Sequence, residues 1–185
     1  IDGSSNKIIT NIEFKDGLVG FGLNEVTNRI YASDGFDNIN VIDGLTNRII
    51  DNIKVEGFLD IIEVDNSMNR IYAASFYTDS IKMIDGLTNQ IIDTLNLENG
   101  SNKSLIGVNT TTNRYYVVNP VREYVSVVDG ETNNLLGTLK IGINSGPQGI
   151  AVNPITNIIY ITRYFTEDVT VIKDDGTSLT VPTPP

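Results

Sequence analysis

The sequence contains no histidine, no cysteine and no tryptophan. Without His or Cys it has no zinc site of the usual kind, no haem or iron–sulfur ligation by these residues, no thiol nucleophile and no Ser-His-Asp triad. Basic residues are also few: 13 Lys and Arg stand against 23 Asp and Glu, so the net charge is −10 and the chain is a poor binder of nucleic acid. No apolar run approaches the roughly 18 residues of a transmembrane helix.

What the sequence does contain is an internal repeat. An Ile-Asp-Gly or Val-Asp-Gly tripeptide occurs at residues 1–3, 42–44, 84–86 and 128–130. A second marker keeps the same phase and ends in tyrosines that are 41, 44 and 44 residues apart, namely Tyr31, Tyr72, Tyr116 and Tyr160. Two markers in one phase indicate about four copies of a unit of about 43 residues.

Each copy of the unit predicts strands rather than helices. Apolar and β-branched side chains alternate with period two at 158–162 and 168–172, and earlier copies add a further strand at 48–55, 90–97 and 135–141. Asn-Pro-x-Thr-Asn and Asp-Gly-x-Thr-Asn motifs separate these strands as turns. Four antiparallel strands in a radially repeated unit are typical of a β-propeller. We therefore predict an all-β propeller of about four four-stranded blades.

The motifs of the last copy resemble a known family. Gly149-Ile-Ala-Val-Asn-Pro-Ile-Thr-Asn-Ile-Ile-Tyr-Ile-Thr162, followed by Val169-Thr-Val-Ile172, is similar to the YVTN-repeat β-propellers of archaeal and bacterial surface-layer-type and other secreted proteins. The resemblance covers residues 1 to about 174. It implies rings of about six to eight blades in full-length relatives, and an extracellular or cell-surface location.

The repeat predicts a partial blade at residues 1–17, full blades at 18–57, 58–103 and 104–148, and an incomplete blade at 149–174. The partial blade includes a fourth strand, Lys7–Phe14, and residues 175–185 are interpreted as a Pro- and Thr-rich linker or tail. Because the sequence opens without Met inside a strand motif, we interpret its start as a cleavage site or as a boundary within a longer protein.

If Lys7–Phe14 completes the last blade, the strands make four whole blades. The chain is then a fragment of a longer array, a small closed ring, or a half-ring that pairs with a second copy. An open half-ring exposes apolar faces and a sheet edge, which proteins normally cover. We therefore favour completion of the ring by further chain or by another subunit.

The recurring residues are interpreted as structural. Asp43, Asp85 and Asp129 each begin a tight turn, in which Asp binds its own backbone and the following Gly supplies a positive φ. A metal site is not needed to explain them. The in-phase tyrosines predict packing between blades rather than a stack for a ligand.

The residues that do not repeat lie in the loops between second and third strands, where binding sites are often placed on a rigid scaffold. Each loop contributes an aromatic residue together with an acidic residue or Arg, and we predict that they line one shallow surface for a glycan or a protein. The candidates are Phe36, Tyr77, Arg122, Tyr124, Arg163 and Phe165.

Asp34, Asp37 and Asp168 are candidates for an oxygen-only calcium site, although the sequence has no Asp-x-Asp-x-Asp-Gly loop. Propeller enzymes that hydrolyse lactones or cleave esters often use a His base, which is absent here. Asn-x-Ser/Thr sequons place glycosylation candidates at Asn99, Asn102 and Asn109, a number that chance alone explains in a chain this rich in Asn, Ser and Thr.

Together these patterns predict a non-enzymatic extracellular or cell-surface scaffold or adhesion module that needs no cofactor. It would associate with itself through its incomplete blade, or with further blades. The alternatives are a propeller that binds a glycan or a protein, and a calcium-dependent, lactonase-like hydrolase.

Overall fold

The structure is a computed structural model that describes residues 3–75, 80–97, 105–176 and 179–180. In these residues the regular structure consists of sixteen strands, which form four four-stranded antiparallel sheets. The first blade contains β1 (Phe21–Asn24), β2 (Arg29–Ser33), β3 (Asn38–Asp43) and β4 (Arg48–Lys54). The second contains β5 (Leu59–Asp65), β6 (Arg70–Ser75), β7 (Ser80–Asp85) and β8 (Ile91–Asn96).

The third blade contains β9 (Leu105–Asn109), β10 (Arg114–Asn119), β11 (Tyr124–Asp129) and β12 (Leu135–Lys140). The fourth contains β13 (Pro147–Asn153), β14 (Ile158–Arg163), β15 (Asp168–Asp174) and β16 (Leu179–Thr180). In each blade the strands pair in chain order. Among the residues that the structure describes, no helix is long and apolar enough to cross a membrane.

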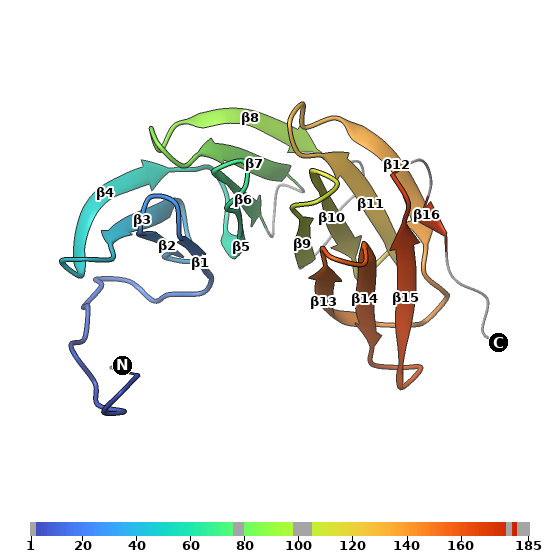
Figure 1. The fold of residues 1–185 in the computed structure, drawn as a ribbon, viewed down its shortest axis with the longest axis horizontal. Coiled ribbons are helices and arrows are strands. Elements are labelled where there is room, and N and C mark those ends of the chain that lie inside the picture. Colours follow the sequence, from blue (N-terminus) through green and yellow to red (C-terminus); the bar gives the residue numbers. More distant parts are fainter. Residues whose placement is uncertain (1–2, 76–79, 98–104, 177–178, 181–185) are drawn as a thin grey trace.

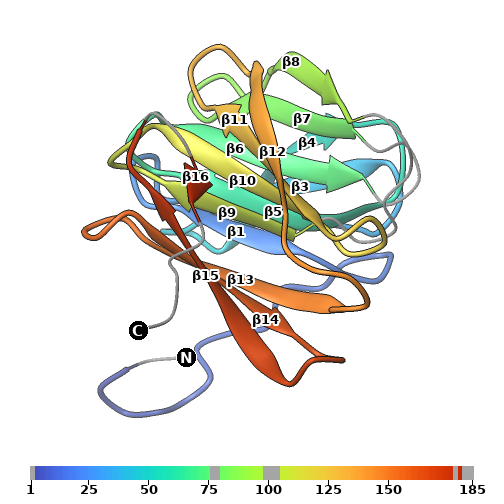
Figure 2. The same cartoon turned by 90° about the vertical axis from the view of Figure 1, so that its right-hand side faces the viewer.

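The four blades stand side by side along an arch, with the first and the fourth at its two ends (Figure 1). The innermost strands β1, β5, β9 and β13 contact one another in that order, while β4, β8 and β12 lie along the outer side. Seen from the side, neighbouring sheets are stacked one behind the other (Figure 2). This radial arrangement of four-stranded sheets confirms the predicted β-propeller fold.

The core lies between blades rather than inside one. Strand residues alternate between the two faces of a sheet. The sheets of the second and third blades therefore have two apolar faces each, one for each neighbouring blade. Three separate clusters of buried side chains result, each made by two consecutive blades. The first, for example, joins Tyr31, Val41 and Ile53 of the first blade to Ile71 and Ile84 of the second.

The turns between third and fourth strands are built differently from the prediction. Asp43 begins the turn as expected, and its Oδ1 accepts bonds from the Thr46 backbone N–H (2.7 Å) and hydroxyl group (2.7 Å). The positive φ, however, belongs to Asn47 (56°) and not to Gly44. Gly44 is needed for space, because a Cβ there would lie 2.5 Å from Oδ1 of Asn28. The same holds for the turns that follow Asp85 and Asp129, where Asn89 and Asn133 have the positive φ.

Within a single copy, the ends of the chain differ from two predictions. Lys7–Phe14 forms no strand in the described structure, and the fourth strand of the last blade is β16, which lies within the predicted linker. That strand pairs only with Lys173 and Asp174 of β15. Within the described part of the chain, the outer edge of residues 168–172 therefore has no partner strand. The fourth blade also begins at Pro147, two residues earlier than predicted.

Candidate functional site

A tyrosine latch fastens each blade to the next. The hydroxyl group of Tyr31 donates to the carbonyl of Gly86 in the second blade at 3.2 Å, and Tyr72 donates to the carbonyl of Gly130 in the third at 3.2 Å. Tyr116 donates to Oδ2 of Asp174 in the fourth blade at 2.5 Å. All three tyrosines are 0% exposed, as their predicted role between blades requires. Burial raises the pKa of each hydroxyl group above its ordinary value, because the phenolate loses its hydration.

The asparagine of positive φ in each turn completes the latch. Asn89 accepts a bond from the Tyr31 hydroxyl group at 3.0 Å and donates its amide to Oδ2 of Asp51 at 2.7 Å, so it grips two strands of the preceding blade. Asn133 reaches back in the same way to Oδ2 of Asp93 at 3.0 Å. The left-handed conformation, which Asn tolerates better than most residues, is what points these amides across the interface.

The third interface departs from the other two at one residue. Asp174 stands where the first three blades have the glycine of their turns, and it is 0% exposed. Its carboxylate accepts from Tyr116 and pairs with Arg114 of the third blade, whose Nη1 lies 2.6 Å from Oδ1. A buried carboxylate is costly unless it is paired and hydrogen-bonded, and here both conditions are met.

The innermost strands approach one another closely. A Cβ at Gly22 of β1 would lie 2.8 Å from a methyl group of Val64 in β5, and a Cβ at Gly107 of β9 would lie 2.9 Å from a methyl group of Val152 in β13. At the end of these strands, the amide of Asn24 donates to Oδ1 of Asn69 in the second blade at 2.6 Å. The first and third interfaces are thus closely packed at their inner ends as well as at their tyrosines.

At the free end of the fourth blade, the same latch has no partner within the described chain. Tyr160 occupies the repeat position of Tyr31, Tyr72 and Tyr116, but it is 37% exposed. On the same side of the sheet, Val169 is 49% exposed, and Val171 lies opposite Tyr160 in the strand pairing. We call the side that bears Tyr160, Val169 and Val171 the fourth-blade free face.

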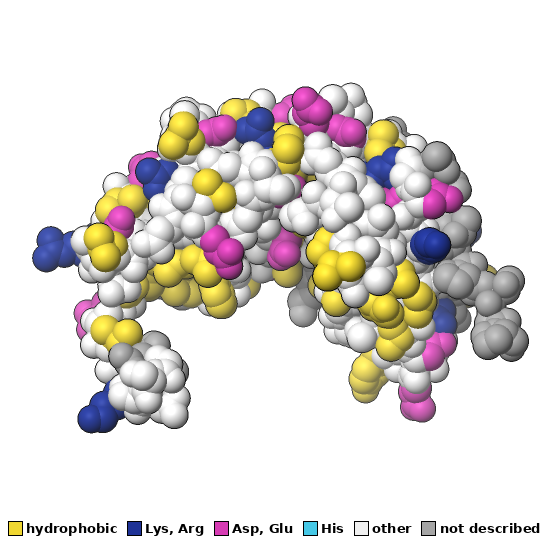
Figure 3. All heavy atoms as spheres, viewed as in Figure 1, with side chains coloured by type: hydrophobic (Ala, Val, Ile, Leu, Met, Phe, Trp, Pro, Cys, Tyr) yellow, Lys and Arg dark blue, Asp and Glu magenta, His cyan; other side chains and the backbone are white. Residues whose placement is uncertain are grey.

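The first blade has a free face of the complementary kind. Phe21 and Leu23 of β1 are 75% and 47% exposed, and Leu23 lies opposite Ile30 in the strand pairing. We call the side that bears these three residues the first-blade free face. The space-filling view shows hydrophobic side chains along the inner side of both arms of the arch (Figure 3). Exposed apolar surface of this kind often marks an interaction site.

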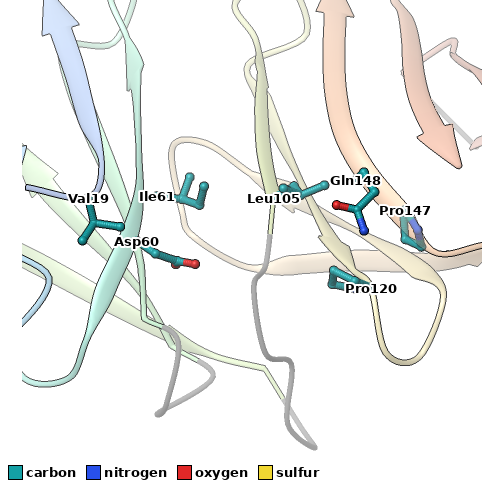
Figure 4. A pocket seen from close by; sticks show the side chains of 7 residues that line it. All are labelled: Val19, Asp60, Ile61, Leu105, Pro120, Pro147 and Gln148. Atoms are coloured by element: carbon teal, nitrogen blue, oxygen red, sulfur yellow. The ribbon is translucent and has the colours of Figure 1, made fainter. Parts of the chain in front are cut away.

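The concave side of the arch holds a pocket of ≈ 340 Å³ (Figure 4). It lies where the innermost strands begin, and its lining includes Ile61 of β5 and Leu105 of β9. Asp60 is its one acidic lining residue. The remaining lining residues are Val19, Pro120, Pro147 and Gln148. Its largely apolar lining offers few groups for chemistry on a substrate.

The predicted ligand-face residues do not line that pocket. Arg122 and Tyr124 instead lie together in a groove of ≈ 390 Å³ between the second and third blades. Phe36 is 60% exposed on the first blade and has an edge-to-face contact with Phe58, with ring centroids 6.1 Å apart. Tyr77 lies outside the described residues.

On the fourth blade, Arg163 is held in place by its neighbours. Its Nε donates to Oδ1 of Asp168 at 2.6 Å and its Nη1 donates to the carbonyl of Ile141 at 2.8 Å. The turn that it clamps presents Phe165, which is 70% exposed, beside Tyr164, which is 69% exposed. The two rings meet edge to face at 5.3 Å. The sequence-based prediction includes Phe165 but not Tyr164, although both lie in the same loop.

The calcium hypothesis is not supported by the placement of its residues. Asp34 is 7% exposed and accepts bonds from the backbone N–H of Phe36 (2.9 Å) and the amide of Asn38 (2.7 Å), so its oxygens serve its own turn. Asp168 lies on the fourth blade, at the other end of the arch from Asp34 and Asp37 (Figure 1). The described residues contain no group of three or more acidic side chains placed to hold a metal ion.

Of the three glycosylation candidates, Asn99 and Asn102 lie outside the described residues. Asn109 is 0% exposed, and its amide nitrogen donates to Oδ1 of Asn157 in the fourth blade at 3.1 Å. That nitrogen is the atom to which a glycan would be attached. In the folded chain Asn109 is therefore part of the third interface rather than an acceptor for a sugar.

These features define the class of protein as a β-propeller whose blades are joined by repeated polar latches. The fold is similar to that of a chain of hydrazine synthase from Kuenenia stuttgartiensis, with a TM-score of 0.76 and 13% sequence identity. The match covers 94% of this chain and 51% of that one, so this chain spans about half the length of the protein that it matches. At this identity the likeness shows the fold alone. No family model and no curated protein matches the sequence.

Proposed function

We propose that the chain is a non-enzymatic scaffold or adhesion module of a cell surface or the extracellular space, and that it associates with itself through the two ends of the arch. The observation that carries this proposal is the contrast at one repeat position. Tyr160 is 37% exposed, whereas Tyr31, Tyr72 and Tyr116 are 0% exposed. A side chain built to latch onto a neighbouring blade has none within the described chain.

The proposed location rests on the resemblance to the YVTN-repeat propellers, carried by residues 149–162 and the in-phase copies before them. A scaffold role agrees with the distribution of the polar side chains. Asp51, Asp93 and Asp174 are engaged in latches between blades, while Asp43 and Asp129 hold turns. These carboxylates are therefore bound within the framework rather than gathered at one site.

The proposal is tested by the mass of the purified chain in solution. Light scattering over a wide concentration range should give multiples of the 20.3 kDa chain mass, and electron microscopy should show closed rings or fibres. Melting curves with and without a calcium chelator should coincide, which would separate the scaffold from the calcium-dependent hydrolase. A chain that remains monomeric at every concentration contradicts self-association.

A second candidate function, binding of a glycan or a protein, is favoured by the aromatic turn of the fourth blade. Tyr164 and Phe165 are 69% and 70% exposed, and the Arg163–Asp168 pair holds the turn that presents them. Exposed aromatic rings on a rigid turn are a common basis for recognition of sugars and of protein partners.

Binding to a glycan array tests this candidate. We expect Tyr164→Ala and Phe165→Ala each to reduce retention of the protein by a glycan while its melting temperature stays unchanged. Phe36→Ala, which removes an exposed ring at the other end of the arch, is the matched control. Equal losses in all three variants would indicate general stickiness rather than a site.

A further inference from the structure

The N-terminal segment repeats the sequence of a fourth strand with its turn. Residues 1–14 align with 42–55 at a constant offset of 41, so that Ile12 corresponds to Ile53 and Phe14 to Val55. The turn is already formed, because Asn6 has a φ of 55°, as Asn47 has with a φ of 56°. The segment therefore repeats the sequence of a fourth strand, and Asn6 repeats the backbone conformation of the preceding turn, but the described chain has no third strand beside it and residues 7–14 form no strand there.

The end of this segment also lies where a preceding blade would place its fourth strand. At the second interface, the end of β8 faces the third blade across a groove of ≈ 390 Å³. One side of this groove is lined by Leu95, Asn96 and Leu97, and the third blade contributes Arg122, Tyr124, Ser126, Leu135 and Thr138. At the first blade, residues 13–16 face the corresponding positions across a groove of ≈ 360 Å³, which is lined by Asp34, Asn38, Asn40, Ile49 and Asn52. The segment thus already occupies one side of an inter-blade interface.

The fourth blade has the opposite deficiency. β15 has no partner strand along residues 168–172 within the described chain, because β16 pairs only with Lys173 and Asp174. The sequence after Thr180 contains Pro182, Pro184 and Pro185, which have no backbone N–H to donate to a neighbouring strand. An unpaired strand edge is a ready template for a strand from another chain.

We propose that residues 10–13 of one copy of this chain form the fourth strand of the blade β13–β15 in a second copy. This inference rests on the self-association proposed above and specifies its structure. The register follows from the other blades, in which Asn38 lies opposite Lys54 and Val41 opposite Asp51. By the same register, the pairs across the two copies are Asp168 with Glu13, Val169 with Ile12, Thr170 with Asn11, and Val171 with Thr10.

The proposed pairing brings the two free faces together. Three residues separate Phe14 from Leu18, as three separate Val55 from Leu59 at the start of β5, so the link to the next blade has the same length in both places. Once its segment is paired, the first blade of one copy therefore stacks on the fourth-blade free face of the other. Tyr160 then reaches the carbonyl of Gly44, as Tyr31 reaches that of Gly86 within the chain.

One pair in this register is unfavourable and supplies a sharp test. Glu13 lies opposite Asp168, whereas the corresponding residues of β4 and β12 are Lys54 and Lys140. Like charges directly opposite each other weaken a strand pair. We expect Glu13→Lys to shift the concentration for half-association at least several-fold lower, while Lys15→Glu, a charge change of the opposite sign two residues along, has no such benefit.

A cysteine pair tests the contact directly, because the chain has no cysteine of its own. Directly opposed residues of antiparallel strands have a Cβ separation close to that of a disulfide. Ile12→Cys combined with Val169→Cys should give disulfide-linked multimers under oxidation. Ile12→Cys combined with Val121→Cys is the control, since Val121 is 64% exposed but lies on the turn after β10. Mixed isotope-labelled and unlabelled protein shows whether each bond joins two copies.

Val169→Asp should abolish association without changing the melting temperature of the monomer. Val121→Asp should change neither the association nor the melting temperature. If the chain associates but Val169→Asp and Glu13→Lys have no effect and the cysteine pair does not link, this inference fails while the proposed self-association stands. Bonds found only within single copies would show that the chain closes on itself. A chain that is monomeric at every concentration overturns both the self-association and the proposed strand pairing. The two ends of the arch would then be covered by blades of another protein.

Discussion

Tyr72 and Tyr160 occupy the same position of the repeat at the middle and at the end of the arch. Tyr72 is 0% exposed, stacks on Tyr115 with ring centroids 4.2 Å apart, and donates to Gly130 of the next blade. Tyr160 is 37% exposed. The difference does not come from the strand that carries each residue, because both strands have the same register with their neighbours. In this fold, therefore, the tyrosine of one blade is buried by the next blade and not by the blade that carries it.

Removal of the two rings is expected to show the largest difference in stability between the two positions. We expect Tyr72→Ala to lower the free energy of unfolding by about 3–5 kcal/mol, because it empties a buried site between two blades. Tyr160→Ala should cost well under half as much in the monomer, since its ring lies partly in water. Urea unfolding of both variants at a concentration where the protein is monomeric measures the difference. Equal losses would contradict the assignment of Tyr160 to an open face.

High pH should destabilise the interface that buries Tyr72 and Tyr115. Burial raises the pKa of Tyr72 and Tyr115 in the folded chain, whereas tyrosines of the unfolded chain titrate near 10. Below that value both states keep the proton and the stabilisation is complete. As the pH rises toward the raised pKa, the unfolded state releases its protons first. The free energy of unfolding should therefore fall by about 1.4 kcal/mol per pH unit for each such tyrosine.

Urea unfolding at a series of pH values from about 9 to about 11 measures this slope. Tyr72→Phe should remove one tyrosine's share of it, and the double variant with Tyr115→Phe should remove two. A slope that both variants leave intact would mean that other groups are responsible for alkaline unfolding.

Much of the fold follows from the sequence because it depends on local patterns. Period-two alternation places the strands, and the in-phase tyrosines indicate packing between blades. The role of Gly44 does not follow in this way. A local rule assigns a positive φ to the glycine of an Asp-Gly turn, but here Asn47 adopts it and Gly44 makes room for Asn28, which is distant in the sequence.

The candidate binding residues show a second limit of sequence reasoning. Phe36 and Phe165 belong to equivalent loops, and a closed propeller would carry both on one face. In this chain they lie on the first and fourth blades, at the two ends of an arch, and so are not brought together (Figure 1). Equivalent loops converge only when the curvature of the array brings them together, and curvature arises from packing between blades. For the same reason Asp34 and Asp168 do not meet.

The smallest expected effect compares two residues with nearly the same backbone conformation. Asn47 and Asn89 have φ values of 56° and 59°, which glycine adopts more readily than asparagine. Asn89 also bonds to Tyr31 and Asp51 across the first interface, so Asn89→Gly should lower the free energy of unfolding by about 1–2 kcal/mol. Asn47 lies on the first blade, which has no preceding blade in the described chain.

Asn47→Gly should therefore change the stability of the monomer by less than about 0.5 kcal/mol, and in the stabilising direction if the relief of backbone strain prevails. Urea unfolding of the two variants side by side measures this pair. In an associated form, Asn47 would face the fourth blade of a neighbouring copy, so the same substitution should then weaken association. A loss of monomer stability as large as that of Asn89→Gly would mean that these asparagines act within their own turn, and that the latch is not formed between blades.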